Sequence, residues 1–176
     1  MDEKQLWRRC VDFHGHECGG LTIGFKAALL AIDLLKLEFS EDENVVCITE
    51  NDACGVDAIQ VILGCSVGKG NLLFHMRGKQ AFTFINRASG ESVRLVLKPG
   101  PDGLSREESF VRMQAMRPVD LFDRMEARVK IPEQARIFQS RNCAVCGERT
   151  AENMMRVQNG ELVCLDCATH YNRFEV

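Results

Sequence analysis

Apolar positions recur at helical spacing near the start of the chain. Leu6, Cys10 and Phe13 fall on one side of a predicted short helix, and Asp2 is placed to cap its first turn. Residues 21–37 are apolar around most of the helical circumference, which predicts a long, central helix. The glycines between these two segments interrupt the helical pattern and allow a tight bend.

The middle of the chain predicts strands. Residues 44–50 are rich in β-branched side chains and indicate a buried strand, and a second apolar helix is expected over residues 56–63. Further strands are expected over residues 72–75, 81–86 and 92–98. The sequence therefore predicts an α+β core domain over residues 1–138, with an antiparallel or mixed sheet packed by helices.

The region after residue 105 returns to a helical pattern. Ser105 and Glu108 fit a capping box that opens a helix, and Pro118 ends it. A further helix is expected over residues 119–129. A polar stretch then leads into a second module, residues 139–176.

Two C-x-x-C pairs dominate that second module. The pairs are separated by seventeen residues and consist of Cys143, Cys146, Cys164 and Cys167. This spacing is typical of a structural zinc site with four thiolate ligands. So short a module cannot build a sufficient core alone, so bound zinc would supply much of its folding energy. We expect a treble-clef or zinc-ribbon-like module; a pair of redox C-x-x-C motifs is the alternative.

The charge of the chain bears on the partners that we expect for it. The chain is 45% hydrophobic and carries a net charge of −3. The second module contains four basic and five acidic residues. This near-balance does not provide the cationic surface that nucleic-acid binding requires. No nucleic-acid partner is therefore expected, and the apolar core favours a homodimer.

The nine cysteines bear on the cellular compartment. The N-terminus lacks the basic-then-apolar order of a signal peptide. Lys26, Asp33 and Lys36 interrupt the most apolar stretch, so no membrane span is expected. Cysteine pairs in a chain without an export signal favour metal over disulfides, and we expect a reducing cytoplasm.

A second group of metal-binding residue types lies near the N-terminus. His14, His16 and Cys18 alternate at a spacing of two, which would place all three on one face of an extended segment. Cys18 also precedes the central helix by about a turn, where helix N–H groups favour a thiolate. The group predicts a transition-metal or nucleophilic site. The alternative is a small core cysteine beside two histidines that serve turn geometry.

Two more cysteines and a lysine are candidates. Cys54 and Cys65 flank the helix predicted over residues 56–63 and lie beside glycines, where a reactive group could point into a cleft. Lys69, between two glycines, is a candidate anion contact, although the phosphate-binding P-loop pattern is absent. Cys10 and Cys47 lie within apolar runs and are expected in the core.

Two long motifs carry a family resemblance. The first is F-H-G-H-E-C-G-G over residues 13–20, followed by G-F-K-A-A; the second is E-N-D-A-C-G-V-D-A-I-Q-V-I-L-G-C-S-V-G-K-G-N-L over residues 50–72. Both resemble signatures of the FmdE family, named after the E subunit of formylmethanofuran dehydrogenase, whose members often add a C-terminal cysteine zinc finger. One departure is Gly19, where the family pattern usually has proline after the motif cysteine.

The resemblance implies a site and a partner. It maps five residues onto the family's cysteine–histidine site, namely His14, His16, Cys18, Cys54 and Cys65. It also maps Lys69 onto the family's glycine-rich loop. The family name implies association with a molybdenum or tungsten enzyme of one-carbon metabolism, but not that this chain catalyses that oxidation.

Two functions follow from these observations. The first is a metal-binding accessory protein that holds a second transition metal (zinc, nickel or iron) in the core and structural zinc in the finger. The second is a small metal- or cysteine-dependent enzyme, in which Cys18 or Cys54 acts as nucleophile or open-site ligand and His16 or His14 as general base. The sequence indicates no substrate. Both functions require the histidines and cysteines of the core to meet around a shared cavity.

Overall fold

The computed structural model describes residues 2–170 and residue 173, in two compact units. The core unit comprises residues 1–135 and the C-terminal unit residues 136–176. Among the described residues, no helix is both long enough and apolar enough to cross a membrane. Each unit is described separately below.

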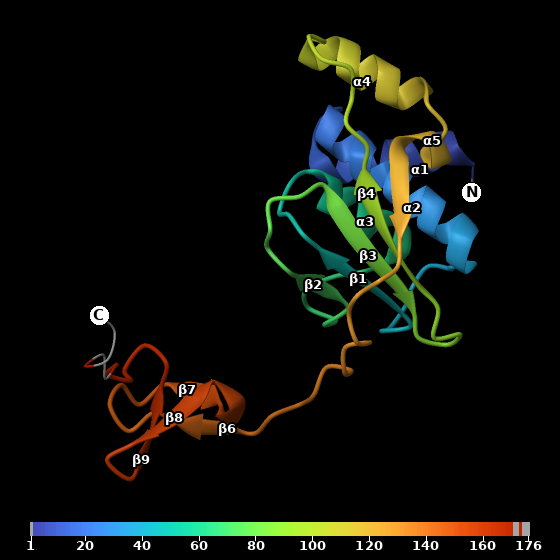
Figure 1. The fold of residues 1–176 in the computed structure, drawn as a ribbon. Coiled ribbons are helices and arrows are strands. Elements are labelled where there is room, and N and C mark those ends of the chain that lie inside the picture. The colour runs from blue at the N-terminus through green and yellow to red at the C-terminus, as the bar shows by residue number, and fades with distance from the viewer. Residues whose placement is uncertain (1, 171–172, 174–176) are drawn as a thin grey trace. The chain divides into compact units, whose positions relative to one another are not determined.

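The core unit contains five helices among its described residues (Figure 1). They are α1 (Glu3–His14), α2 (Gly19–Leu35), α3 (Gly55–Leu63), α4 (Arg106–Ala115) and α5 (Pro118–Leu121). Asp2 caps α1, as expected, because its side chain accepts a hydrogen bond from the Gln5 N–H. The predicted capping box of Ser105 and Glu108 opens α4, with both reciprocal hydrogen bonds formed.

Five strands form one mixed sheet in the order β2-β1-β3-β4-β5. They are β1 (Val45–Thr49), β2 (Leu72–Phe74), β3 (Ala81–Asn86), β4 (Ser92–Leu97) and β5 (Phe122–Met125). β1 pairs in parallel with β2, and the other neighbours are antiparallel. The predicted α+β class with a mixed sheet packed by helices is confirmed.

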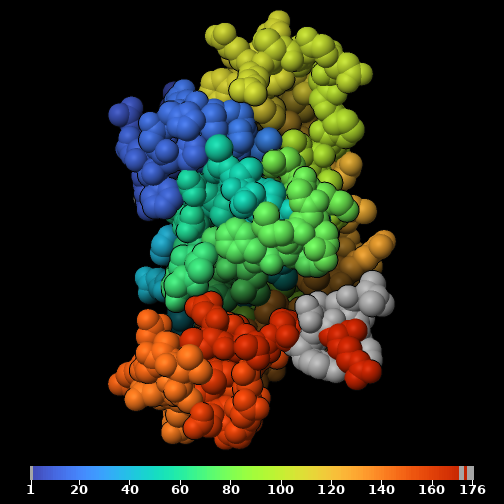
Figure 2. Space-filling model, turned by 90° about the vertical axis from the view of Figure 1, so that its left-hand side faces the viewer, coloured from blue at the N-terminus to red at the C-terminus, as the bar shows by residue number. Residues whose placement is uncertain are grey.

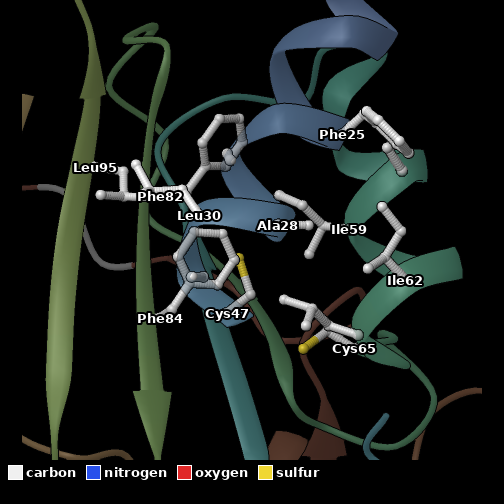
Figure 3. Packing of buried hydrophobic residues seen from close by; sticks show 14 of the residues in the cluster. Phe25, Ala28, Leu30, Cys47, Ile59, Ile62, Cys65, Phe82, Phe84 and Leu95 are labelled. Carbon is white, nitrogen blue, oxygen red and sulfur yellow. The ribbon is translucent and has the colours of Figure 1, made fainter. Parts of the chain in front are cut away.

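The main core lies between the sheet and helices α2 and α3. Phe82 and Phe84 point from β3 toward Leu30 of α2, and Ile59 of α3 lies in the same cluster (Figure 3). All four side chains are buried. Because side chains of a strand alternate, Ile85 joins a smaller cluster on the opposite face of the sheet. The expected burial of Cys10 and Cys47 is also confirmed.

The two central helices cross at a pair of glycines. A methyl group built at Gly24 of α2 would lie 1.8 Å from the carbonyl oxygen of Gly55, the first residue of α3. Only a residue without a side chain permits this separation of the two backbones. The crossing fixes the start of α3 against α2, and both helix N-termini carry candidate site residues.

The helix expected over residues 119–129 is a wrong prediction. The structure has only the short α5 there, followed by β5, which pairs with the edge of β4 through Leu97 and Phe122. Phe122 is buried in the main core. Pairing with β4 and burial of this aromatic ring outweigh the local helical pattern.

The last part of the core unit, residues 126–135, forms a strap without regular secondary structure. Arg87 donates hydrogen bonds to two main-chain carbonyl oxygens of the strap, those of Pro132 and Glu133. The carboxylate of Glu43 accepts hydrogen bonds from the Ala135 N–H at 3.1 and 3.2 Å. Side chains from the sheet region therefore hold the strap by its backbone.

One buried ion pair gives a prediction about pH. Arg94 of β4 donates two hydrogen bonds to the carboxylate of Glu50, at 2.6 and 2.9 Å, and Glu50 is only 7% exposed. The hydrogen bonds from Arg94 hold the pKa of Glu50 below its ordinary value of 4.5. A carboxyl group with a lowered folded-state pKa stabilises the fold above its unfolded-state pKa, and this stability is lost as the pH falls through the folded-state value.

We therefore expect Glu50→Gln to destabilise the protein near neutral pH by about 3 kcal/mol, because Arg94 is left unpaired. The difference from wild type should shrink as the pH falls below 4.5. Urea unfolding at a series of pH values measures it, and Glu38→Gln, at an exposed position, is the control. A Glu50→Gln deficit that stays constant down to acid pH would contradict the assignment.

The C-terminal unit contains two hairpins among its described residues. They are formed by β6 (Ser140–Asn142) with β7 (Arg149–Ala151) and by β8 (Met155–Gln158) with β9 (Glu161–Cys164). A single 3-10 turn, η1 (Glu152–Met154), joins them. The second hairpin turns at Asn159 and Gly160, both with positive φ, as is typical of a two-residue Asn-Gly hairpin turn.

Candidate metal centre

A tight turn between α1 and α2 brings three donor side chains together. His14 is the last residue of α1, and Gly15 ends that helix in the left-handed conformation with φ of 94°. Cys18 then caps α2. The donor atoms of His14, His16 and Cys18 all lie within 4.8 Å of one another. The three residues come together because the chain turns sharply between the end of α1 and the start of α2. They do not lie on one extended segment, as their alternate spacing in the sequence predicted.

His14 is held in one orientation by a carboxylate. Its Nδ1 lies 2.7 Å from Oδ2 of Asp57, and its Nε2 lies 3.8 Å from Sγ of Cys18. The His14 side chain is 12% exposed. When Nδ1–H donates to the carboxylate, the lone pair of Nε2 faces the cysteine. This is the carboxylate–histidine pair that supports metal-binding histidines in proteins.

Asp57 is a site residue that the sequence reasoning missed. It lies in the first turn of α3, forty-three positions from His14 along the chain. Its sequence signals are its place within the motif of residues 50–72 and its position three residues after Cys54, which puts both residues at the N-terminal end of one helix.

The sulfur of Cys18 sits at the N-terminus of α2. It accepts a hydrogen bond from the Leu21 N–H at 3.3 Å, as an N-cap side chain does. Free N–H groups and the positive end of the helix dipole favour a negative charge at this position. A thiolate, the form of cysteine that binds metals and acts as a nucleophile, could accept the same hydrogen bond at this position.

The structure brings Cys54 to this group. A methyl group built at Gly20 would lie 3.4 Å from Sγ of Cys54 and 3.9 Å from Sγ of Cys18, so both sulfurs border the same glycine. Burial, followed by the nearby Cys18 sulfur, raises the pKa of Cys54. Cys54 is thus a neighbour of the three donors.

The structure does not bring Cys65 to this group. Its thiol donates to the Val45 carbonyl oxygen at 3.6 Å, and it is fully buried in the main core. Burial raises its pKa to about 12, which disfavours the thiolate a metal requires. The family resemblance maps Cys65 onto the site together with Cys54. In the structure these two cysteines lie at opposite ends of α3.

Lys69 lies in a different pocket from Cys18. Its ammonium group donates to the Ser40 carbonyl oxygen at 2.6 Å and lies 5.7 Å from the centre of the Phe39 ring. The observed contacts hold the glycine-rich loop against the segment before β1. A ligand contact for Lys69 stays a prediction.

A pocket of about 620 Å³ opens beside the donor group. His16, Cys18 and Cys54 form one side of it, and residues of α4 form another. Figure 2 shows α1 in blue and α4 in yellow at the same end of the core unit. A second pocket of about 380 Å³ is lined by His14, Cys54 and Asp57. The donors are therefore accessible from outside the fold.

The spacing of the core donors suits a transition ion. A tetrahedral ion bound at about 2.1 Å to nitrogen and about 2.3 Å to sulfur needs roughly 3.6 Å between those two donors. The observed 3.8 Å between His14 and Cys18 is close to this value. Three protein donors, if all bind, leave the fourth position open, which distinguishes this group from a closed structural site.

The four C-terminal cysteines form the second donor group. Their sulfurs lie within 4.8 Å of one another, and those of Cys146 and Cys164 are 3.9 Å apart. Neighbouring thiolates around tetrahedral zinc lie roughly 3.8 Å apart. Backbone N–H groups of Cys146 and Cys164 lower the pKa of Cys143 to about 6, whereas the neighbouring Cys164 and Cys146 sulfurs raise the pKa of Cys167 to about 12. The donor set fits one zinc ion with no open position.

Two family models match the chain. The family model described as "FmdE, Molybdenum formylmethanofuran dehydrogenase operon" matches residues 13–145. The chain belongs to the FmdE family. A second model, the prokaryotic dksA/traR C4-type zinc finger, matches residues 136–173. The FmdE membership, the zinc-finger match and the two donor groups support a metal-binding accessory protein.

Two individual proteins resemble this FmdE chain. A tungsten formylmethanofuran dehydrogenase FmdE-like protein from Syntrophus aciditrophicus has the same fold, with a TM-score of 0.71, 24% identity, and coverage of 95% of this chain and 92% of its own. A probable S-adenosyl-L-methionine-binding protein from Archaeoglobus fulgidus is 27% identical over 95% of this chain. The FmdE chain spans 53% of the length of that relative.

Proposed function

We propose that the chain is an accessory protein that binds a transition metal through His14, His16 and Cys18 and keeps structural zinc in its finger. The observation that carries the proposal is the arrangement of Asp57, His14 and Cys18, in which a carboxylate orients an imidazole toward the sulfur of the capping cysteine. Neither a structural turn nor a core cysteine requires this arrangement. Cys54 stands beside the site as a further sulfur.

Metal counting tests the proposal directly. Elemental analysis of the purified wild-type protein should give two metal ions per chain. Cys18→Ser should retain one, because the four-cysteine site does not use this residue. The control is Cys10→Ser, in the core and outside both donor groups. One metal ion per chain in both wild type and Cys18→Ser would refute the core site.

Replacing the orienting carboxylate should weaken the core metal selectively. Asp57→Asn is expected to lower the affinity of the core site about 10- to 100-fold, since supporting partners of metal-binding histidines typically contribute this much. Competition with a chelating dye measures the affinity. Asp12→Asn on exposed α1 should leave it unchanged. An unaltered affinity in Asp57→Asn would show that the carboxylate plays no part in metal binding.

The second candidate is a small enzyme that uses the same residues. The observation in its favour is the pocket that exposes Cys18 and Cys54 beside His16. In such an enzyme Cys18 or Cys54 is the nucleophile and His16 the base. The metal-free protein would then show one core cysteine that reacts with iodoacetamide far faster than the others. Uniformly slow alkylation of the core cysteines would speak against this candidate.

We also propose roles for the parts of the chain. The core domain (residues 1–138) would hold the functional metal, and the zinc finger (residues 139–176) would brace it or contact a partner. The family description, which names molybdenum, and the name of the similar solved structure, which names tungsten, support a molybdenum or tungsten enzyme as that partner. A homodimer, a reducing cytoplasm and the lack of a nucleic-acid partner complete the proposal. Light scattering on the purified chain tests the dimer.

A further inference from the structure

The pocket beside the core donors has an apolar wall, to which helix α4 contributes. Its apolar lining consists of Ile23, Leu104, Phe110 and Met113. None of the ten described residues of α4 is buried, although the helix carries Phe110 and Met113. Both side chains are half-buried and line the pocket, and Met113 also packs against the main core. Pockets of this size and apolar character typically bind small organic ligands.

Helix α4 packs against the beginning of α2. The Met113 methyl group lies 3.0 Å from where a Cβ would stand on Gly19, at the start of α2. Gln114 donates to the Thr22 hydroxyl at 2.9 Å. Both contacts fix α4 over the N-terminus of α2, where Cys18 lies. The attachment thus sets the apolar wall against the donor group.

The charges around the pocket do not favour a charged ligand. Its lining includes the cation Arg106 and the carboxylates Glu17 and Glu107. The Trp7 indole donates to the Glu17 carboxylate at 3.1 Å, so that group already has a partner. One cation against two carboxylates makes no anion site. What distinguishes the pocket is an apolar wall on one side and imidazole and sulfur donors on the other.

We propose that this pocket binds a small uncharged organic thiol with an apolar body. The inference rests on the proposed core metal site. The body would lie against Phe110 and Met113, and the sulfur would take the coordination position that His14, His16 and Cys18 leave open. Borderline ions held by imidazole and thiolate accept a further sulfur ligand readily. The thiol proton passes to the buffer as the metal–sulfur bond forms, and no oxidation is involved.

Two thiols of different size test the inference. Protein with cobalt in the core site and zinc in the finger is titrated with phenylmethanethiol and with 2-mercaptoethanol, and the cobalt spectrum reports binding. Burying the phenyl ring should give phenylmethanethiol about a tenfold or larger advantage in affinity. Phe110→Ala and Met113→Ala should each reduce this advantage several-fold and leave 2-mercaptoethanol binding unchanged. Val111→Ala, on the same helix but 60% exposed and outside the pocket lining, should keep the full advantage.

The possible outcomes separate the two proposals. Equal affinities for the two thiols, or an advantage that persists in both α4 variants, would overturn the pocket assignment while leaving the metal site intact. Failure of the core to take up cobalt in a Cys18-dependent manner would overturn both. Circular dichroism of the α4 variants should match wild type, because neither side chain is buried.

Discussion

Cys164→Ser is expected to unfold the described part of the C-terminal unit while the core unit stays folded. The unit's buried hydrophobic cluster contains only Cys143, Val163 and Cys164 among the described residues, so it cannot supply a sufficient core. Structural zinc contributes on the order of 10 kcal/mol or more to such modules, and losing one of four thiolates removes most of it. The expected result is a folded core with an unstructured tail.

Nuclear magnetic resonance measures this outcome residue by residue. In Cys164→Ser, the amide signals of residues 140–164 should collapse to random-coil positions, and those of α2 and the sheet should remain dispersed. A strong chelator should do the same to wild type. Val145→Ala changes an exposed side chain inside the first C-x-x-C turn and should leave every signal in place. A C-terminal unit that keeps its dispersed signals after complete zinc removal would refute the structural role of the metal.

Among the substitutions of a core-unit glycine by alanine, Gly24→Ala is expected to lower the stability of the fold most. The added carbon would lie 1.8 Å from the Gly55 carbonyl oxygen, and the obstacle is backbone that no side-chain rotation can move. Overpacking of this kind costs about 3 kcal/mol or more, a large part of the roughly 5–15 kcal/mol that stabilises a domain. Since α3 must move away from α2, Asp57 should also withdraw from His14.

Two measurements separate these effects. Urea unfolding should show the loss of stability in Gly24→Ala, and metal counting should show that the core site weakens in whatever fraction remains folded. Gly68→Ala is the matched control, because a methyl group there meets no described atom within 4 Å. If Gly24→Ala is as stable as Gly68→Ala, the two helices do not cross as closely as described.

Much of the fold could be predicted because local signals and tertiary demands agree. The β-branched run of residues 44–50 became β1, and the capping box at Ser105 opens α4, each close to the expected limits. The two C-x-x-C pairs needed only their spacing, since the ion imposes the geometry. The helix expected over residues 119–129 failed because the edge of β4 offered hydrogen bonds that no local pattern reveals.

The core site was only partly predictable for a related reason. His14, His16 and Cys18 are neighbours in sequence, so their convergence needed no knowledge of the fold. Asp57 reaches His14 only because α1 and α3 come together, and an aspartate in the first turn of a helix is otherwise unremarkable in sequence. Cys65 lies in the core, and its position there could not be predicted because a cysteine beside a glycine has the same sequence pattern whether it faces a cleft or the core.

The strap of residues 126–135 is held by hydrogen bonds to its main chain, and this affects which amino-acid substitutions it tolerates. Arg87 and Glu43 bind main-chain atoms at residues 132, 133 and 135, so these bonds do not depend on which side chains the strap carries. Substitutions between residues 126 and 135 can therefore accumulate over generations without altering the path of the strap. Arg87 and Glu43 are the positions at which such drift would be prevented.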